Sequence, residues 1–197
     1  EHHILNLKKA GSNNIVINHA WLGEKIESYF ADGQKWSVNI EYSREGDSAL
    51  ETAGGIVKAL PLLGEEPFLI VNGDIFSDVD FTSFINQAKS FLSKTSLAHL
   101  LLVPNPEHNL DGDFAINDSQ QLSRSINDAQ AKYTYSGIGV YSPKLFSGLV
   151  LEKKALAPIL FKAMEQGVIS GHLYEGLWSD IGTPARLAEM NQQYISV

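Results

Sequence analysis

Hydrophobic residues recur along the first half of the chain at two alternating periods, one typical of buried strands and the other of helices. Residues 15–18 (IVIN) are predicted to form a short buried strand, and the apolar positions of residues 22–30 then recur at the i, i+4 and i+7 spacing of a helix. The same order returns where the continuous apolar run 68–71 precedes a wide apolar stripe at helical spacing over residues 81–92. Strands that alternate with helices of this length imply right-handed crossovers. The pattern therefore predicts an α/β fold with a Rossmann-like, mainly parallel sheet and helices on both faces.

The pattern changes between residues 104 and 141, where the helical period gives way to short β-like pieces. We expect this segment to be a small antiparallel β insertion. Helical spacing returns at residues 156–164, and two further strands are expected before Thr183-Pro184, a capping hydroxyl followed by a first-turn proline. No internal repeat or low-complexity linker interrupts the sequence, so residues 1–197 are expected to form a single domain into which 104–141 is inserted.

Composition excludes several classes of protein. The 197 residues are 44% apolar and 19% charged, which is typical of a globular domain and excludes a disordered or fibrous chain. A formal net charge of −8 repels nucleic acid and anionic membranes, so neither is an expected partner. The absence of cysteine excludes disulfides, thiolate zinc sites and a cysteine nucleophile, and it agrees with a cytoplasmic protein.

Two aspartates stand at the ends of predicted strands. Asn72-Gly73-Asp74 follows the apolar run 68–71 directly, and Asp180 ends a late predicted strand just before a predicted helix. Ligands of open parallel sheets bind beyond the carboxyl ends of the strands, where a carboxylate suits Mg²⁺. For Asp74 alone, an ordinary turn aspartate is an equally good interpretation. Two carboxylates at converging strand ends indicate a metal site more strongly than one.

The segment LETAGG, residues 50–55, is predicted to be a glycine-bearing loop before a helix that starts near Ile56. Backbone N–H groups at such a helix start suit an anion or the polar edge of a base, and glycine permits close approach. The segment matches neither GxGxxG nor the GxxxxGK[ST] phosphate loop, so a flexible turn is the alternative interpretation.

Asp78-Val79-Asp80 has the spacing of the metal-binding aspartates in many glycosyltransferases. The segment lies several residues beyond the predicted strand end, however, and Asp80 is better explained as the N-cap of the helix over residues 81–92. His2 and His3 are expected to be surface residues without a role, and the other histidines lack metal-ligand spacing. Neither HExxH nor GxSxG occurs, so hydrolysis at a zinc or serine site is disfavoured.

Four motifs resemble, in order and spacing, those of the sugar-1-phosphate nucleotidyltransferases: LETAGG (50–55), FLIVNGD (68–74), YSGIGVY (135–141) and WSDIGTP (178–184). The resemblance covers nearly the whole chain and implies the nucleotidyltransferase fold, which is similar to that of GT-A glycosyltransferases. Residues 15–26 (IVINHAWLGEKI) and 60–64 (LPLLG) point to the branch that acts in bacterial cell-wall recycling. That branch transfers UMP from UTP to N-acetylmuramic acid 1-phosphate and releases pyrophosphate.

The resemblance leaves other substrates and other classes open. Mannose-1-phosphate guanylyltransferases share much of the same pattern, and glucose-1-phosphate thymidylyltransferases are a further alternative. Two alternatives come from other classes: a non-catalytic nucleotide-sugar-binding subunit or sensor, and a metal-dependent glycosyltransferase that uses Asp78 and Asp80. The sequence does not identify the nucleobase, and it is compatible with both a monomer and a homodimer.

The resemblance also implies roles for individual residues. Asp74 and Asp180 would be the catalytic pair and would coordinate Mg²⁺. The nucleotide-binding residues would be Glu51, Thr52, Ala53, Gly54, Gly55, Asn72 and Gly73. The sugar-binding residues would be Gly112, Asp113, Ser136 and Gly137.

The chain departs from the family pattern in two places. The family's glycine-rich signature, whose arginine and lysine cradle the triphosphate, is expected ahead of Glu1, so the chain is expected to lack the first strand and the triphosphate-binding loop. Activity is then expected to need that segment. Residues 126–128 (IND) stand where many relatives place an acidic and a basic residue against the sugar and its phosphate.

Overall fold

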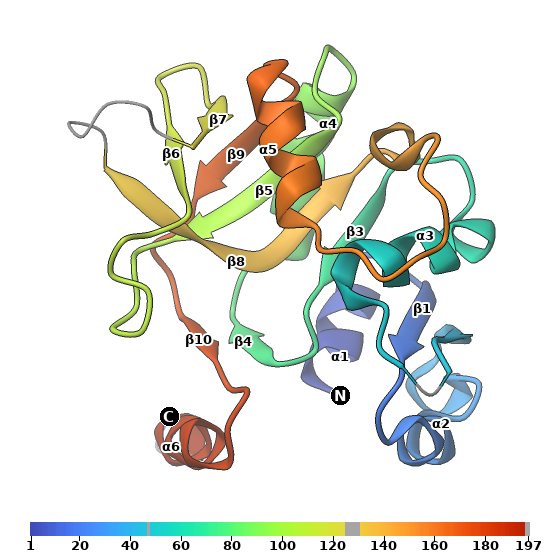
Figure 1. Cartoon of the computed structure of the whole chain (residues 1–197). Helices are drawn as coiled ribbons and strands as arrows, with labels where there is room; N and C mark the ends of the chain where they lie inside the picture. The colour runs from blue at the N-terminus through green and yellow to red at the C-terminus, as the bar shows by residue number, and fades with distance from the viewer. Residues whose placement is uncertain (47, 125–130, 196–197) are drawn as a thin grey trace.

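The computed structural model describes residues 1–46, 48–124 and 131–195 (Figure 1). The helices are α1 (His2–Lys9), α2 (Gly23–Phe30), α3 (Glu51–Leu63), α4 (Phe81–Leu92), α5 (Ala157–Glu165) and α6 (Pro184–Ile195). The strands are β1 (Asn14–His19), β2 (Asn39–Arg44), β3 (Phe68–Val71), β4 (Ile75–Ser77), β5 (Ala98–Val103), β6 (Phe114–Ile116), β7 (Leu122–Ser123), β8 (Lys132–Tyr141), β9 (Ile169–Leu173) and β10 (Trp178–Asp180). In this part of the chain, no helix has the length and apolar character that a membrane span requires.

The α/β class and the predicted alternation of strands and helices are confirmed, but the sheet is mixed. Strand β8 crosses the middle of the main sheet and runs antiparallel to β3, β5 and β6 (Figure 1). Strands β3 and β5, which α4 connects, are therefore parallel to each other, as a crossover requires, but β8 lies between them. The other parallel pairs in the described part are β5 with β9 and β1 with β2. In the main sheet β3, β5 and β9 thus run in one direction, and β8 runs against them.

The strands β6, β7 and β8, which the sequence placed in an antiparallel insertion at 104–141, are antiparallel to one another. They are continuous with the main sheet, because the C-terminal half of β8 pairs with β3 and β5. Residues 126–128, where the sequence departs from the family pattern, lie outside the described residues.

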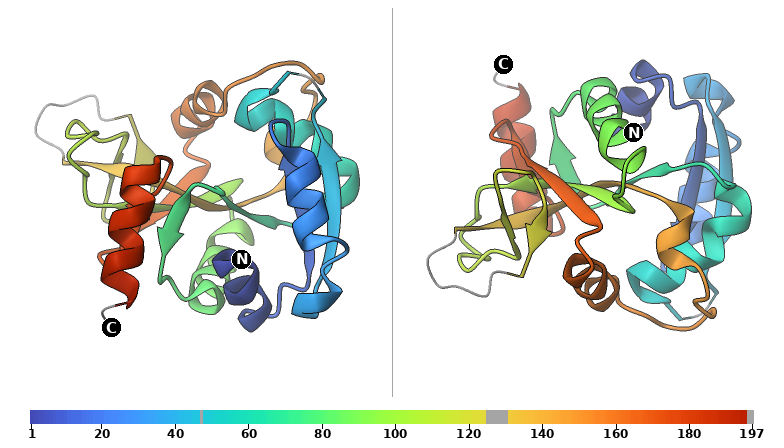
Figure 2. Two further views of the ribbon diagram at one scale, coloured as in Figure 1. Left: turned by 90° about the horizontal axis from the view of Figure 1, so that it is seen from below. Right: turned by 90° about the horizontal axis from the view of Figure 1, so that it is seen from above.

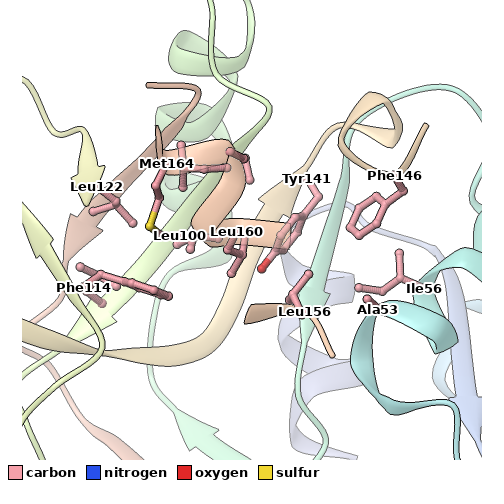
Figure 3. Packing of buried hydrophobic residues seen from close by; sticks show 14 of the residues in the cluster. Ala53, Ile56, Leu100, Phe114, Leu122, Tyr141, Phe146, Leu156, Leu160 and Met164 are labelled. Atoms are coloured by element: carbon pink, nitrogen blue, oxygen red, sulfur yellow. The ribbon is translucent and has the colours of Figure 1, made fainter. Parts of the chain in front are cut away.

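Helices cover both faces of the main sheet. One face packs Leu100 and Leu102 against α5 and α3, and Figure 3 shows this cluster. The opposite face packs Leu101 against α4, with α1 at its edge. Successive residues of β5 thus serve opposite cores, which explains why the whole strand is buried and, apart from His99, apolar. A third, smaller cluster forms around β1 and β2, where Trp36 and Ile40 are buried.

Candidate active site

Strand β10 brings Asp180 beside the segment that carries Asp74. Strands β10 and β4 pair antiparallel with Asp180 opposite Ile75, and the Ile181 N–H donates to the Asp74 carbonyl oxygen at 2.8 Å. In Figure 1 this small two-stranded sheet lies below the main sheet, with α6 directly after it. Two aspartates that are far apart in the sequence therefore lie on neighbouring backbone segments.

The carboxylates of the two aspartates face one point, the open side of Gly182. A Cβ added at Gly182 would lie 3.0 Å from Asp180 Oδ1 and 3.6 Å from Asp74 Oδ2. Carboxylate oxygens are hard ligands, and Mg²⁺ sites commonly use one or two of them and complete the shell with phosphate and water. No group of three or more potential metal-ligating His, Cys, Asp or Glu side chains occurs among the described residues. The pair therefore fits a divalent cation that substrate phosphates share.

Helix α1 holds the strand that follows Asp74. The His2 and His3 rings each donate from Nε2 to a β4 carbonyl oxygen, that of Ser77 at 2.9 Å and that of Ile75 at 2.8 Å. Burial lowers the pKa of His3 below its ordinary value. The expectation that the two histidines are surface residues without a role is therefore wrong. Local sequence carried no signal for these contacts, because the partners are 75 and 72 residues away.

The YSGIGVY motif forms a bulge in β8 at Ser136 and Gly137. The register with β5 shifts here, and Gly137 has a φ of +80°, which favours glycine. The buried Ser136 hydroxyl donates to the Leu101 carbonyl oxygen at 2.8 Å, and the Trp178 indole N–H donates to the Ser136 carbonyl oxygen at 2.9 Å. The Asn72 side chain lies against Gly137, where an added Cβ would be 2.8 Å from its Nδ2. The bulge thus joins β3, β8 and β10, and Ser136 shapes the backbone from within.

The loop before β6 holds Gly112 and Asp113 through its own polar network. Gly112 has a φ of +62°, and an added Cβ would lie 2.8 Å from Asn105 Oδ1. The Asp113 carboxylate accepts the Tyr135 N–H at 2.8 Å and the Asn109 amide at 3.2 Å. Asp113 therefore fastens the loop to β8, and any contact it makes to a sugar would have to share a carboxylate that is already hydrogen-bonded.

The same loop brings a histidine beside Asp180. His108 Nε2 lies 3.5 Å from Asp180 Oδ2, and the same oxygen accepts from Arg186 Nη1 at 2.7 Å. Sequence reasoning missed both residues, because their convergence depends on a loop and a helix start that are distant in the chain. The predicted sugar loop and the predicted metal ligand are thus brought together.

The LETAGG segment is helical, which corrects the predicted loop. Helix α3 begins at Glu51, and the N–H groups of Ala53 and Gly54 donate to the Lys154 carbonyl oxygen at 3.0 and 3.2 Å. A Cβ at Gly54 would lie 2.4 Å from the Glu152 carbonyl oxygen. In this structure, the segment around residues 152–154 occupies the space that the sequence analysis assigned to a ligand.

Protein groups likewise occupy the space beside Gly55. An added Cβ would lie 2.5 Å from Glu45 Oε1 and 2.7 Å from Asn18 Nδ2, two atoms that hydrogen-bond to each other at 2.9 Å. Glu51 and Thr52 are exposed at the helix start, and Glu51 has a φ of +58°. Within the predicted LETAGG part of the nucleotide-binding set, these two are the residues whose side chains are open to a ligand.

The glycosyltransferase alternative loses its metal ligands. The Asp78 carboxylate accepts from the Tyr174 hydroxyl and from the Leu177 N–H, so it anchors the connection between β9 and β10. Asp80 is the N-cap of α4 as predicted, with a backbone N–H of the first turn donating to its carboxylate at 2.9 Å. The Ser83 hydroxyl, which also donates to that carboxylate, holds the pKa of Asp80 below its ordinary value.

Comparison with known proteins shows the family of the chain. The family profile described as nucleotidyl transferase matches residues 1–197. The chain is 48% identical over 188 residues to the N-acetylmuramate alpha-1-phosphate uridylyltransferase of Neisseria meningitidis serogroup B, covering 95% of this chain and 80% of that protein. It is 27% identical to the UTP–glucose-1-phosphate uridylyltransferase of Synechocystis, covering 71% of this chain and 39% of that protein.

A solved structure shows the same fold. The crystal structure of HddC from Yersinia pseudotuberculosis superposes with a TM-score of 0.77 at 18% identity, covering 97% of this chain and 83% of that one. The family match over the whole sequence and the identity to the Neisseria protein confirm the resemblance that the sequence motifs indicated. The chain therefore belongs to the nucleotidyl transferase family, among the sugar-1-phosphate nucleotidyltransferases that its motifs resemble.

Proposed function

We propose that this protein transfers UMP from UTP to N-acetylmuramic acid 1-phosphate in bacterial cell-wall recycling, giving a nucleotide sugar and pyrophosphate. The convergence of Asp74 and Asp180 on one point supports the reaction type. The 48% identity to the Neisseria protein of that activity supports the choice of substrates.

The transfer of UMP to the sugar 1-phosphate needs little general-base catalysis. A phosphate oxygen of the sugar 1-phosphate forms a bond to the α-phosphorus of UTP, the bond between the α- and β-phosphates breaks, and pyrophosphate leaves with the electron pair. The nucleophile is already anionic, so positioning and charge neutralisation dominate. Two polyanions must approach each other in a protein whose formal net charge is −8. The site must therefore supply positive charge that reverses the negative electrostatic potential around it.

The part of Asp74 and Asp180 would be to hold a divalent cation, for which we propose Mg²⁺. Such a cation, when bound, neutralises phosphate charge and polarises the α-phosphorus. The chain supplies placement: the pairing of β4 with β10 fixes the distance between the two carboxylates, and the missing side chain at Gly182 leaves their shared face open. His2 and His3 support β4 from its other side.

We place the nucleobase near Glu51 and Thr52 and the sugar near the loop before β6. The exposure of both side chains at the start of α3 supports the first assignment. The contact of His108 with Asp180 supports the second, because it brings that loop to the metal-site carboxylate. Gly112, Ser136 and Gly137 would act by shaping the backbone around the sugar.

We further propose that a strand and a triphosphate-binding loop stand ahead of residue 1. Among the described residues, β1 pairs only with β2 and β3 only with β8, so each offers a free edge that another strand can join. A cytoplasmic location, where nucleoside triphosphates are available, belongs to the same proposal.

The test is a pyrophosphate-release panel with the full-length protein. Four nucleoside triphosphates are combined with the 1-phosphates of N-acetylmuramic acid, N-acetylglucosamine, glucose and mannose. We expect the highest kcat/KM for UTP with N-acetylmuramic acid 1-phosphate. We expect Asp74→Asn to lower turnover by about 10²-fold or more, the scale of losing one preorganised electrostatic group.

Other outcomes favour the alternatives. A higher kcat/KM for GTP with mannose 1-phosphate, or for dTTP with glucose 1-phosphate, would replace the proposed substrates by those of the guanylyl or thymidylyl branch. Binding of a nucleotide sugar without pyrophosphate release from any pair would identify a sensor or non-catalytic subunit.

A further inference from the structure

One oxygen of Asp180 is shared by two basic side chains. Oδ2 accepts from Arg186 Nη1 at 2.7 Å and lies 3.5 Å from His108 Nε2. The other oxygen, Oδ1, accepts from the Gly182 N–H at 2.8 Å and lies, like Asp74 Oδ2, beside the open side of Gly182. No described residue donates a hydrogen bond to the Asp74 carboxylate. Basic partners therefore gather at only one member of the aspartate pair.

The backbone of Arg186 is fixed by the cap at the start of α6. The Thr183 hydroxyl accepts the Arg186 N–H at 3.3 Å, and the Leu187 N–H donates to the Thr183 carbonyl oxygen at 3.0 Å, so the first turn of α6 is capped. The Arg186 side chain as a whole is 37% exposed, and its contact with Asp180 is partly buried. Figure 2 shows α6 standing beside the sheet at the end of β10, apart from the main helical layers.

A guanidinium and a divalent cation cannot both be close partners of one carboxylate without repelling each other. When a cation displaces the guanidinium from Asp180, the guanidinium lies beside the place where phosphates are proposed to bind. Guanidinium groups bind phosphate through two parallel N–H donors, a geometry that lysine does not offer. The contact between Arg186 and Asp180 is therefore suited to an exchange in which the guanidinium leaves the carboxylate and binds a phosphate.

We propose that Arg186 is an exchangeable partner of Asp180, which neutralises this carboxylate when no divalent cation is bound and binds the phosphate of the sugar 1-phosphate once a cation has replaced it. This inference rests on the proposed function, because it assumes a metal site at the aspartate pair and an anionic acceptor beside it. It assigns Arg186 to the binding of the acceptor, the sugar 1-phosphate. In the metal-free protein, Arg186 stays paired with Asp180.

The first measurement is the affinity of the nucleotide-free protein for Mn²⁺. The free Mn²⁺ is quantified from its electron paramagnetic resonance signal. Arg186→Gln removes the competitor, so we expect it to bind Mn²⁺ about threefold or more tighter than the unsubstituted protein, the scale of one partly exposed ion pair. Arg186→Lys keeps a competing charge and should bind Mn²⁺ nearly as the unsubstituted protein does.

The second measurement is steady-state kinetics with the same variants. The KM for the sugar 1-phosphate should rise about 10-fold or more in Arg186→Gln, while the KM for UTP changes little. Arg186→Lys should recover only part of this loss, because it lacks the paired donors. The matched control is Arg44→Gln, which breaks another arginine–carboxylate pair, with Glu27 at 2.6 Å, and should change neither quantity.

Each outcome bears on a different claim. Equal or weaker Mn²⁺ binding by Arg186→Gln, with binding retained in the unsubstituted protein, would overturn the exchange and leave the proposed function intact. A raised KM for UTP with an unchanged KM for the sugar 1-phosphate would overturn the assignment of Arg186 to the acceptor. An unsubstituted protein that binds no Mn²⁺ and still releases pyrophosphate would overturn the metal site and the exchange together.

Discussion

Gly54 in helix α3 gives a prediction in which two effects of opposite sign compete. Replacing glycine by alanine inside a helix normally stabilises it by about 1 kcal/mol. Here the added Cβ would lie 2.4 Å from the Glu152 carbonyl oxygen, which is backbone and cannot rotate away. Overpacking of this kind costs about 1–3 kcal/mol, and a backbone contact this short belongs at the upper end. We therefore expect Gly54→Ala to destabilise the protein by about 2 kcal/mol after the helix gain is subtracted.

Thermal and urea unfolding measure this effect. A loss of about 2 kcal/mol corresponds to a fall in Tm of about 4–8 °C for a chain of this length. Gly73→Ala is the control, because its added Cβ would meet nothing within 4 Å and its φ is not positive. That variant should be unchanged or more stable by up to about 1 kcal/mol. A Gly54→Ala protein that is more stable than the unsubstituted one would refute the packing of residues 152–154 against the start of α3.

Two further predictions concern histidines. Burial lowers the pKa of His99 to about 4, so as pH falls from the unfolded value near 6.5 the unfolded state takes up the proton first and the folded state loses stability. The loss should approach roughly 3 kcal/mol near pH 4, and His99→Gln should remove most of it in urea titrations at pH 7 and 4.5, whereas an unchanged pH dependence would contradict the assignment. For His3, glutamine keeps an N–H donor for the Ile75 carbonyl oxygen and leucine does not, so Gln should hold kcat within about threefold while Leu lowers it by about 10-fold. Equal kcat for the two variants would show that the hydrogen bond does not position β4.

The features that sequence predicted are those whose cause is local. The alternation of apolar runs and helical stripes fixed most elements, because each reflects burial on one face of a short segment. The cap at Asp80 was predicted because a side chain two residues from the first-turn N–H needs no tertiary information. The convergence of Asp74 and Asp180 followed from a rule about strand ends and from the family motifs, and the structure places both beside Gly182.

The features that sequence missed depend on distant partners. Two adjacent glycines favour a loop by helix propensity, but α3 begins at Glu51 because neighbouring segments fill the space beside Gly54 and Gly55. The central place of β8 depends on where the chain returns after a long excursion, which periodicity does not encode. The contacts of His108 and Arg186 with Asp180 join a loop and a helix start, and neither has a spacing that marks it as functional.

The central claim is that the two strand-end aspartates hold one divalent cation beneath the phosphates of a bound nucleotide. Anomalous diffraction from crystals of the full-length protein grown with Mn²⁺ and UTP tests it most directly. We predict a metal peak in contact with a carboxylate oxygen of both Asp74 and Asp180 and with the nucleotide. A metal bound to the nucleotide but to neither aspartate would contradict the account.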